Sequence, residues 1–490
     1  MRDLIIDCFA GGGGASVGIE MALGRSVDIA INHDPQAIRM HKTNHPKTLH
    51  LTEDIFEVDL QKYVKGQHVA LMWASPDCTS HSKAKGGKPR EKGLRILPWA
   101  VYKHAKTILP DVILMENVEE IKQWGPLDDN GYPIKARKGE DYNKFITAMK
   151  SLGYVVDSRE LVAADYGAPT TRCRWYAVFR RDGKAIVWPK PTHNKCGTDG
   201  LKKWEPIWKY LDLHDFGKSI FERKKPLAEK TMNRIARGIE KFVFNCPEPF
   251  IIPVNHSRDC MISPLLIQYH SETTSKGVRG QSVEEPIMTL DTSNRYALVM
   301  SFLTKFYKTG TGQSMFEPIH TITTSPGNFG QVNILAIPKE QLLANLEKGI
   351  NDGSEIIQKC TWVSQFIMEY YGCSIGQSIN DPLHTIVTKD RFALVTVLGN
   401  EYAIIDICLR MLKAEPELKL GQSFPRDYII THDYQGKKYP VCEQVARIGN
   451  SVAPIVAEAL VDVNCWYLKV GERIPNRMIE QEQSSQLRLA

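Results

Sequence analysis

The sequence predicts an α/β fold in which helices cover a mainly parallel sheet. Over the first 180 residues, short apolar strand-like segments alternate with helix-like segments, which is the pattern of strand–helix–strand units. Polar motifs follow directly after several of the apolar runs, where the carboxyl ends of parallel strands form a ligand-binding edge. Helix-like character resumes after about Tyr402, so a large insertion interrupts the α/β region.

The elements of the α/β region follow from local patterns. Short apolar runs rich in Val and Ile predict strands at Leu4–Phe9, Val27–Ile31, Val69–Trp73, Val112–Met115, Val155–Leu161 and Trp175–Phe179. Apolar residues at helical spacing predict helices at Ala15–Leu23, Pro35–Asn44, Leu97–Leu109, Tyr142–Leu152 and, near the end, Ala453–Val463.

The middle of the chain has a different character. Pro189, Pro191 and residues 194–200 are typical of a linker, and residues 225–242 predict a basic amphipathic helix. A repeat follows: Gly-Gln-Ser stands four residues before a proline at 280–282, 312–314 and 376–378. Alternating β-branched residues after each proline predict a strand-rich unit. The repeat is either purely architectural, or Gln281, Gln313 and Gln377 contact a substrate.

Composition limits the classes of protein. With 490 residues, the chain is expected to form two or more domains. No apolar run approaches the roughly 18 residues that span a membrane, and Met1–Leu4 enters a strand-like segment without a signal-peptide pattern, so we expect a cytoplasmic protein. The 11 cysteines are scattered without a Cys-x-x-Cys pair, so neither a disulfide framework nor a metal site is expected. The net charge of +6 does not by itself establish a polyanionic partner.

The first polar motif is a glycine-rich loop between a strand and a helix. Phe9–Gly14 places backbone amides and a helix N-terminus where they can hold a cofactor, although glycines also make tight turns. Later strand ends bring Asn32, His33, Asp54 and Ile55 to the same edge. An acid about 20 residues after the glycines would bind ribose hydroxyls; Asn32 stands there, with Asp34 nearby.

The second motif surrounds Cys78. It lies in a polar loop that is unusual for a buried cysteine, and six cations follow it: Lys83, Lys85, Lys88, Arg90, Lys92 and Arg95. Positive charge favours the nucleophilic thiolate, and a glycine-hinged basic loop suits closure over a phosphate backbone. An ordinary solvated basic loop is the alternative.

The third motif is a carboxylate with two arginines. Glu116 ends an apolar strand, where a carboxyl group is suited to donating a proton near neutrality. A buried carboxylate satisfied by backbone amides is the alternative. Arg172 and Arg174 alternate at strand spacing and point the same way, so their guanidinium groups can grip a carbonyl oxygen or a phosphate.

Taken together and in order, these motifs resemble the DNA (cytosine-5)-methyltransferase family, particularly its phage and prophage versions. The family motifs Phe-x-Gly-x-Gly-Gly, Pro-Cys, Glu-Asn-Val, Arg-x-Arg and Gly-Asn-Ser-Val match, respectively, Phe9–Gly14, Pro76–Cys78, Glu116–Val118, Arg172–Arg174 and Gly449–Val452. The resemblance covers about 180 N-terminal and about 90 C-terminal residues. Two departures are the inserted Asp77 and Asn32, which replaces the family's ribose-binding Glu.

The resemblance implies a Rossmann-like, S-adenosylmethionine-dependent core in residues 1–182 and 401–490, with a β-rich target recognition domain at 183–400. It implies that Cys78, Glu116, Arg172 and Arg174 are catalytic. It implies cofactor binding by Phe9, Ala10, Gly11, Gly13, Gly14, Asn32, His33, Asp54, Ile55, Pro76, Asn450 and Val452.

The implied reaction is methylation of cytosine carbon-5 in a specific double-stranded DNA sequence, through a cysteine adduct on a flipped base. The expected setting is a monomer in the cytoplasm of a bacterial or phage-infected cell, without a metal or a membrane partner. Three alternatives remain: an RNA (tRNA) cytosine methyltransferase, a nicotinamide-dependent oxidoreductase and a catalytically inactive DNA-binding regulator. The oxidoreductase leaves Cys78 and Glu116 without roles, and the inactive regulator predicts damage to residues that are intact.

Overall fold

The chain divides into two compact units, described here from a computed structural model. We call Met1–Glu205, Pro318–Pro326 and Ala414–Ala490 the core unit, and Pro206–Glu317 and Gly327–Lys413 the inserted unit. The structure describes residues 2–77, 95–212, 215, 217–221, 223–239, 265–268, 280–282, 296–305, 316–319, 329–338, 396–397 and 402–470.

The core unit is built on a seven-stranded sheet, counted over the described residues, with the order β3-β2-β1-β4-β5-β7-β6. The first five strands in sequence run parallel, and β7 runs antiparallel to both β5 and β6. The strands are β1 (Leu4–Cys8), β2 (Ile29–Ile31), β3 (Leu49–Leu51), β4 (Val69–Ala74), β5 (Val112–Asn117), β6 (Val155–Val162) and β7 (Cys173–Arg180). The predicted α/β class and all six predicted strands are confirmed; β3 is an addition.

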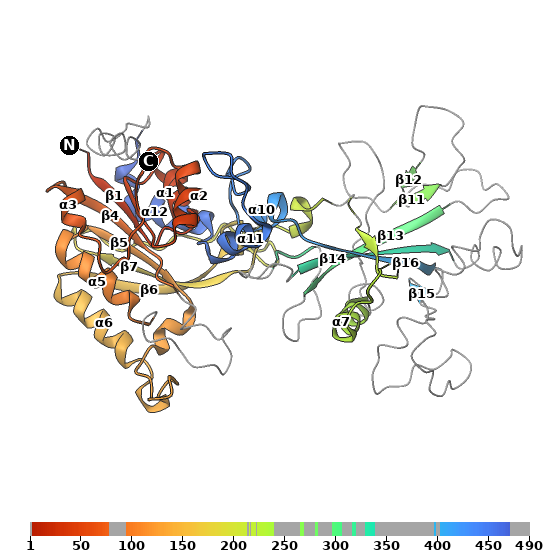
Figure 1. Ribbon diagram of the computed structural model, residues 1–490, viewed down its shortest axis with the longest axis horizontal. Coiled ribbons are helices and arrows are strands. Elements are labelled where there is room, and N and C mark those ends of the chain that lie inside the picture. Colours follow the sequence, from red (N-terminus) through yellow and green to blue (C-terminus); the bar gives the residue numbers. More distant parts are fainter. Residues whose placement is uncertain are drawn as a thin grey trace, which may run out of the picture. The chain divides into compact units, whose positions relative to one another are not determined.

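Helices cover both faces of this sheet (Figure 1). Side chains of α1 (Gly14–Leu23) and α12 (Pro454–Cys465) form one apolar core with the sheet, and those of α3 (Leu60–Val64), α5 (Leu97–Ile108) and α6 (Glu140–Ser151) form the other. The remaining helices of the described core unit include α2 (Pro35–Asn44) and α11 (Val441–Asn450). The five helices predicted for the α/β region are all present, and the one predicted at Ala453–Val463 is α12.

Helix α2 begins where its sequence predicts. Asp34 is the N-cap residue, and its carboxylate accepts hydrogen bonds from the amides of Gln36 and Ala37, while Pro35 occupies the first turn. These features satisfy backbone donors that have no partner within the helix and preset the helical φ angle.

Two glycines of α1 allow α12 and the residues just before it to pack closely against α1. A Cβ atom on Gly14 would lie 1.9 Å from Ser451 Oγ, and one on Gly18 would lie 2.4 Å from the carbonyl oxygen of Pro454. The helical run Val441–Leu468 is long and apolar enough to cross a membrane by length and composition alone, but 61% of its apolar window is buried inside the protein. Its α12 portion is a core helix.

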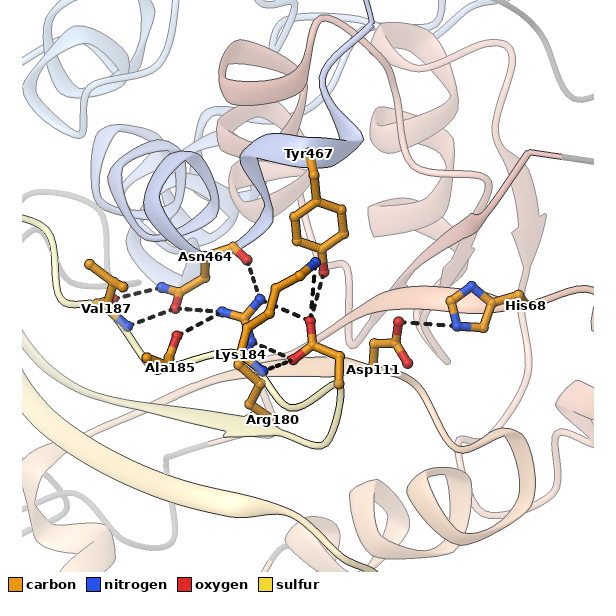
Figure 2. A network of polar contacts seen from close by, with 9 residues as sticks. His68, Asp111, Arg180, Lys184, Ala185, Val187, Asn464 and Tyr467 are labelled. Carbon is orange, nitrogen blue, oxygen red and sulfur yellow. Dashed lines mark hydrogen bonds and ion pairs between the residues drawn. The ribbon is translucent and has the colours of Figure 1, made fainter.

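A polar network anchors the end of α12 to the turn after β7 (Figure 2). The buried guanidinium group of Arg180 donates to Asp182, to the Ala185 carbonyl and to both the side chain and the backbone carbonyl of Asn464. Nearby, the ammonium group of Lys184 lies 3.2 Å from the centre of the Tyr467 ring. These contacts lie where β7 ends, at the opposite end of the sheet from the polar motifs.

The inserted unit contains an antiparallel sheet with the order β10-β16-β14-β13-β11-β12, and β15 pairs with β16. These strands are β10 (Lys218–Ser219), β11 (Leu265–Gln268), β12 (Gly280–Ser282), β13 (Tyr296–Lys305), β14 (Phe329–Pro338), β15 (Thr396–Val397) and β16 (Tyr402–Met411). Helix α7 (Glu229–Ile239) lies within the predicted helix and buries Met232, Ile235, Ala236 and Ile239 at helical spacing.

The repeat is described only in part. Gln281 lies in β12, whereas Gln313, Gln377 and the segments after the first and third prolines lie outside the described residues. The long strands β13, β14 and β16 come later in the chain than the strand segments predicted after each proline. Of the segment after the second proline, Ile319 is described, and it belongs to the core unit.

The linker prediction for residues 189–200 is wrong. This segment belongs to the core unit, where β8 (His193–Asn194) pairs with β9 (Lys202–Lys203). The Asn194 side chain accepts hydrogen bonds from the amides of Cys196, Gly197 and Thr198. These bonds hold the backbone of the segment in a defined turn, although the segment contains few apolar residues.

Candidate active site

The predicted site residues gather along one edge of the core sheet. Strands β1, β2, β3, β4 and β5 end at this edge, and the antiparallel β7 begins there. The chain order runs outward from β1 in one direction to β3, and from β4 in the other, so β1 and β4 flank the point where strand order reverses. Ligands bind at such points in open α/β sheets. The edge therefore has a glycine-loop half at β1–β3 and a carboxylate half at β4, β5 and β7.

The glycine loop turns sharply between β1 and α1. Phe9, Gly11 and Gly13 adopt positive φ angles of 66°, 52° and 94°. The Ala10 amide donates to the Ile31 carbonyl over 3.0 Å, and the Ser75 amide donates to the Cys8 carbonyl over 3.3 Å. These bonds join the loop to the ends of the two flanking strands.

Only part of the loop is open to a ligand. A Cβ atom on Gly11 would meet nothing closer than the Phe9 carbonyl oxygen at 3.8 Å, whereas one on Gly13 would lie 2.2 Å from the Tyr428 hydroxyl. The Tyr428 hydroxyl also donates a hydrogen bond to the Gly12 carbonyl. Gly13 and Gly14 are therefore required by protein packing, and Gly11 is the glycine whose backbone a bound molecule can approach.

Asn32 and Asp34 follow β2 beside this loop. Asn32 Oδ1 accepts a hydrogen bond from the Asp34 amide over 2.8 Å, and Asn32 is half-buried. The Asp34 carboxylate caps α2 with one oxygen and pairs with Arg447 through the other, at 2.5 Å. Because both oxygens of Asp34 have partners, Asn32 is the side chain of the two that remains suited to a ligand. His33 and Asp54 are exposed at neighbouring strand ends, and Ile55 is buried.

A buried hydrogen-bonded chain lies beneath the glycine loop, and sequence reasoning missed it. Ser16 Oγ donates to Asp7 Oδ2 over 2.6 Å. His41 Nε2 lies 3.0 Å from Ser16 Oγ, and His41 Nδ1 lies 2.8 Å from Nε2 of the half-buried His50. A charged residue in the otherwise apolar run of β1 was the available signal. We call Asp7, Ser16, His41 and His50 the buried chain.

Burial controls the protonation of this chain. It raises the pKa of the fully buried Asp7 to about 7, against the lowering effect of the Ser16 hydrogen bond. It lowers the pKa of His41 well below the ordinary histidine value and lowers that of His50 to about 3, so both imidazoles are neutral near pH 7. Asp7 Oδ1 has no hydrogen-bond partner within the described part of the chain.

The carboxylate half places Glu116 between two arginines. Glu116 Oε1 lies 3.4 Å from Arg174 Nε and 3.9 Å from an Nη atom of Arg172. The Glu116 and Arg172 side chains are only 8% and 4% exposed, so solvent screens their interaction weakly. Arg172 also donates to the Gly449 carbonyl over 3.1 Å, which connects this half to the end of α11.

The residue after Glu116 connects β5 to the cysteine loop. Asn117 Nδ2 donates to the carbonyl oxygen of Pro76 over 3.1 Å, and both residues are buried. Asp77 is exposed, and Cys78 and residues 79–94 lie outside the described residues. Arg95, predicted as part of the basic loop, is instead buried and donates to the Gly125 carbonyl. It therefore anchors the end of that loop and is not available to a phosphate.

The late Gly-Asn-Ser-Val motif lies against the glycine loop. Asn450 is exposed at the end of α11, whereas Val452 is buried and its carbonyl oxygen is 2.4 Å from the position of a Cβ on Gly14. Ser451 and Val452 thus face the same loop as Tyr428. Within the described ranges, no group of three or more His, Cys, Asp and Glu side chains is arranged to hold a metal ion.

Comparison with known proteins identifies the family. A model of the C-5 cytosine-specific DNA methylase family matches residues 4–308, more than half of the chain. Type II methyltransferase M.AquIA of Picosynechococcus sp. is 30% identical over 200 residues, which are 39% of this chain and 78% of that protein. Type II methyltransferase M1.HphI of Haemophilus parahaemolyticus is 27% identical over 286 residues, which are 56% of this chain and 70% of that protein. The solved structure of S. pombe Dnmt2 methyltransferase aligns with a TM-score of 0.48 and 12% identity, over 96% of this chain and all of that one.

Proposed function

The chain belongs to the C-5 cytosine-specific DNA methylase family, and from this premise we propose that it transfers a methyl group from S-adenosylmethionine to cytosine carbon-5 in a specific double-stranded DNA sequence. It is a DNA (cytosine-5)-methyltransferase. The proposal concerns the finer points of this activity: the methyl donor, the cysteine adduct, the flipped base and the roles of individual residues.

One observation supports the proposed chemistry above the others. A buried carboxylate, Glu116, lies within 3.9 Å of two guanidinium groups, and its neighbour Asn117 is hydrogen-bonded to the loop that leads into Cys78. An acidic group and two cations therefore lie together at one sheet edge, beside the start of the loop that carries the proposed nucleophile. A pyrimidine ring needs these three kinds of group for activation toward electrophiles.

In the proposed mechanism, the Cys78 thiolate adds to carbon-6 of cytosine, because carbon-5 is a poor nucleophile until that bond forms. Glu116 stabilises the proton on ring nitrogen 3, and Arg174 binds the exocyclic carbonyl oxygen with support from Arg172. S-adenosylmethionine supplies an electrophilic methyl group. After carbon-5 has been methylated, loss of its proton breaks the sulfur–carbon-6 bond and releases the thiolate.

The target base has to leave the duplex to reach this edge. Flipping costs a few kcal/mol, and closure of the loop that carries Lys83, Lys85, Lys88, Arg90 and Lys92 over the phosphate backbone would offset part of that. We propose that the inserted unit, or residues 183–400 as the sequence divides the chain, reads the DNA sequence. The repeated glutamines are suited to base-edge contacts in the major groove.

The glycine-loop half fits a nucleoside-containing cofactor. The open backbone at Gly11, with its φ of +52°, provides the close approach that a cofactor needs. Phe9 is half-buried at the rim, and Asn32, His33 and Asp54 add polar groups from the next two strand ends. Phe9, Gly11, Asn32, Asp54 and Ile55 would hold the donor, and the exposed Asn450 would contact it from α11.

Tritiated S-adenosylmethionine with unmethylated genomic DNA and, separately, tRNA tests the proposal. We expect label in DNA that bisulfite sequencing assigns to one short motif, and none in tRNA. Cys78→Ser should abolish labelling, and an oligonucleotide with 5-fluorocytosine in that motif should form a stable adduct with the wild-type protein only. Label in tRNA but not in DNA would favour the RNA alternative, and full activity of Cys78→Ser would contradict the mechanism.

A further inference from the structure

One short segment from the middle of the insertion belongs to the core unit. The chain leaves the inserted unit after Glu317, contributes Pro318–Pro326 to the core unit and re-enters the inserted unit at Gly327. Ile319 in this segment is fully buried. It follows Pro318 in the second copy of the Gly-Gln-Ser repeat.

Ile319 is joined by its backbone to the loop that leads into the arginine motif. Its amide donates to the Pro169 carbonyl over 2.7 Å, and its carbonyl accepts a hydrogen bond from the Thr171 amide over 2.8 Å. Thr170 and Ile319 thereby form an isolated parallel bridge. Such a pair of bonds fixes both the distance and the direction of the loop backbone next to Arg172.

Arg172 is consequently held from three sides. Its carbonyl accepts a hydrogen bond from the Ala163 amide over 2.9 Å, its side chain contacts Glu116 and the Gly449 carbonyl, and the preceding amide is bonded to Ile319. Of these contacts, the bond to Ile319 comes from the short segment that lies, in sequence, between the two parts of the inserted unit. The residue before this segment is fixed as well, because the Glu317 carbonyl accepts a hydrogen bond from the Ile207 amide over 3.1 Å.

We propose that Ile319 is a positioning residue for the arginine pair at Glu116, and that its backbone acts as a clamp on the Pro169–Thr171 loop. This rests on the proposed function, because the arginine pair matters only if it holds the base. The matching positions in the other two copies, Ile287 and Leu383, lie outside the described residues. A small displacement of a group that binds the reacting ring is enough to slow the chemical step.

Three variants test the clamp: Ile319→Ala, the conservative Ile319→Val and the matched Ile287→Ala in the first copy. Steady-state tritium incorporation into unmethylated genomic DNA gives kcat and the KM for S-adenosylmethionine. Alanine keeps the backbone groups of Ile319 but removes its fully buried side chain, so the segment should be held less firmly and its two backbone bonds to the loop should weaken. We therefore expect Ile319→Ala to lower kcat on the order of tenfold, while that KM and the affinity for the same DNA in a gel shift stay within about twofold. Ile319→Val should restore wild-type kcat, and Ile287→Ala should retain it.

Hydrogen exchange provides a readout that does not depend on activity. The Thr171 amide of the wild-type protein should be protected, and the peptide 167–174 should exchange faster in Ile319→Ala without a general loss of protection. Wild-type kcat in Ile319→Ala, an equal loss in Ile287→Ala, or an unprotected Thr171 amide in the folded wild-type protein would each overturn the clamp. A wild-type protein that labels no DNA would contradict the proposed function instead, and the exchange measurement would still decide the clamp.

Discussion

Replacing Asp7 by Asn should change how the stability of the protein depends on pH. Asp7 is completely buried, and its pKa rises from 3.8 in the unfolded chain to about 7 in the folded protein. The folded state therefore retains a proton that the unfolded state has lost over the interval from about pH 4 to pH 7. In that interval unfolding releases a proton, so the Asp7 contribution to stability falls as pH rises.

The size of the effect follows from the two pKa values. At pH 5 the unfolded carboxyl group is largely ionised and the folded one is protonated, so burial of Asp7 lowers the free energy of unfolding by the equivalent of about one pKa unit. By pH 8 the reduction is equivalent to about three pKa units. At 1.36 kcal/mol per unit, the free energy of unfolding loses about 3 kcal/mol between pH 5 and pH 8 because of Asp7. The carboxamide that Asp7→Asn introduces does not titrate, and its carbonyl oxygen can still accept a hydrogen bond from Ser16.

Urea denaturation of wild type and Asp7→Asn at pH 5, 6, 7 and 8 measures this difference. The buried histidines contribute with the opposite sign, because their lowered pKa values make stability rise with pH up to about 6.5, but they are present in both proteins and largely cancel. Asp129→Asn, at an exposed position, is the control and should leave the pH profile unchanged. A constant offset between Asp7→Asn and wild type over this range would refute the raised pKa and the dry environment assigned to the buried chain.

Three further predictions concern packing and cofactor affinity. Arg180→Met should lower the free energy of unfolding in urea by about 3–5 kcal/mol, because it leaves buried polar partners unpaired, whereas Lys184→Met at a half-exposed side chain should cost at most about 1 kcal/mol. Gly14→Ala should lower the free energy of unfolding by about 3 kcal/mol or more, because its methyl group would lie 1.9 Å from the Ser451 hydroxyl oxygen. The control Gly66→Ala, whose methyl group would meet no atom within 4 Å, should lower it by only about 1 kcal/mol because of the positive φ at that position. Asn32→Glu should tighten S-adenosylmethionine binding on the order of tenfold, as measured by calorimetry, because a carboxylate accepts stronger hydrogen bonds from ribose hydroxyls. Unchanged affinity would show that residue 32 does not contact the ribose.

The sequence was sufficient for the parts of the fold that depend on local pattern. In the core sheet, the strands with four or more consecutive apolar residues (β4, β5 and β7) were all found, because burial on both faces of a mainly parallel sheet requires such runs. Strands β13, β14 and β16 of the inserted unit contain similar runs and were missed. The prediction of helix-like character after about Tyr402 is wrong, because β16 (Tyr402–Met411) begins there. Strand β3 was missed because Leu49–Leu51 is a three-residue segment with a histidine at its centre. The segment 189–200 was misassigned because its order depends partly on distant partners, such as the hydrogen bond from the Thr192 amide to the Asp165 carbonyl.

The candidate site divides in the same way. Strand-end motifs such as Glu116 were visible, since parallel strands necessarily end at one edge. The packing of Tyr428 against the glycine loop was not visible in the sequence. Tyr428 is 416 residues away from Gly12, whose carbonyl it contacts, and nothing in the local sequence of either residue indicates the other. The burial of Arg95 was likewise hidden, because a cation in a basic run looks the same whether it meets phosphate or a buried carbonyl.

The position of the insertion explains how a core that depends on its own C-terminal segment tolerates about 200 intervening residues. Closing a flexible loop costs free energy that grows only with the logarithm of its length, so lengthening one tenfold adds about 2 kcal/mol. The inserted unit reduces even this cost, because its two ends are held together. Strand β10 pairs with β16, Arg410 donates to the carbonyls of Asp212 and Asp215, and Lys413 forms ion pairs with both aspartates. With its ends fixed in this way, the sequence between them can change without disturbing the contacts of Tyr428 and Ser451 with the glycine loop. The proposed role of the inserted unit in reading DNA sequence requires this tolerance.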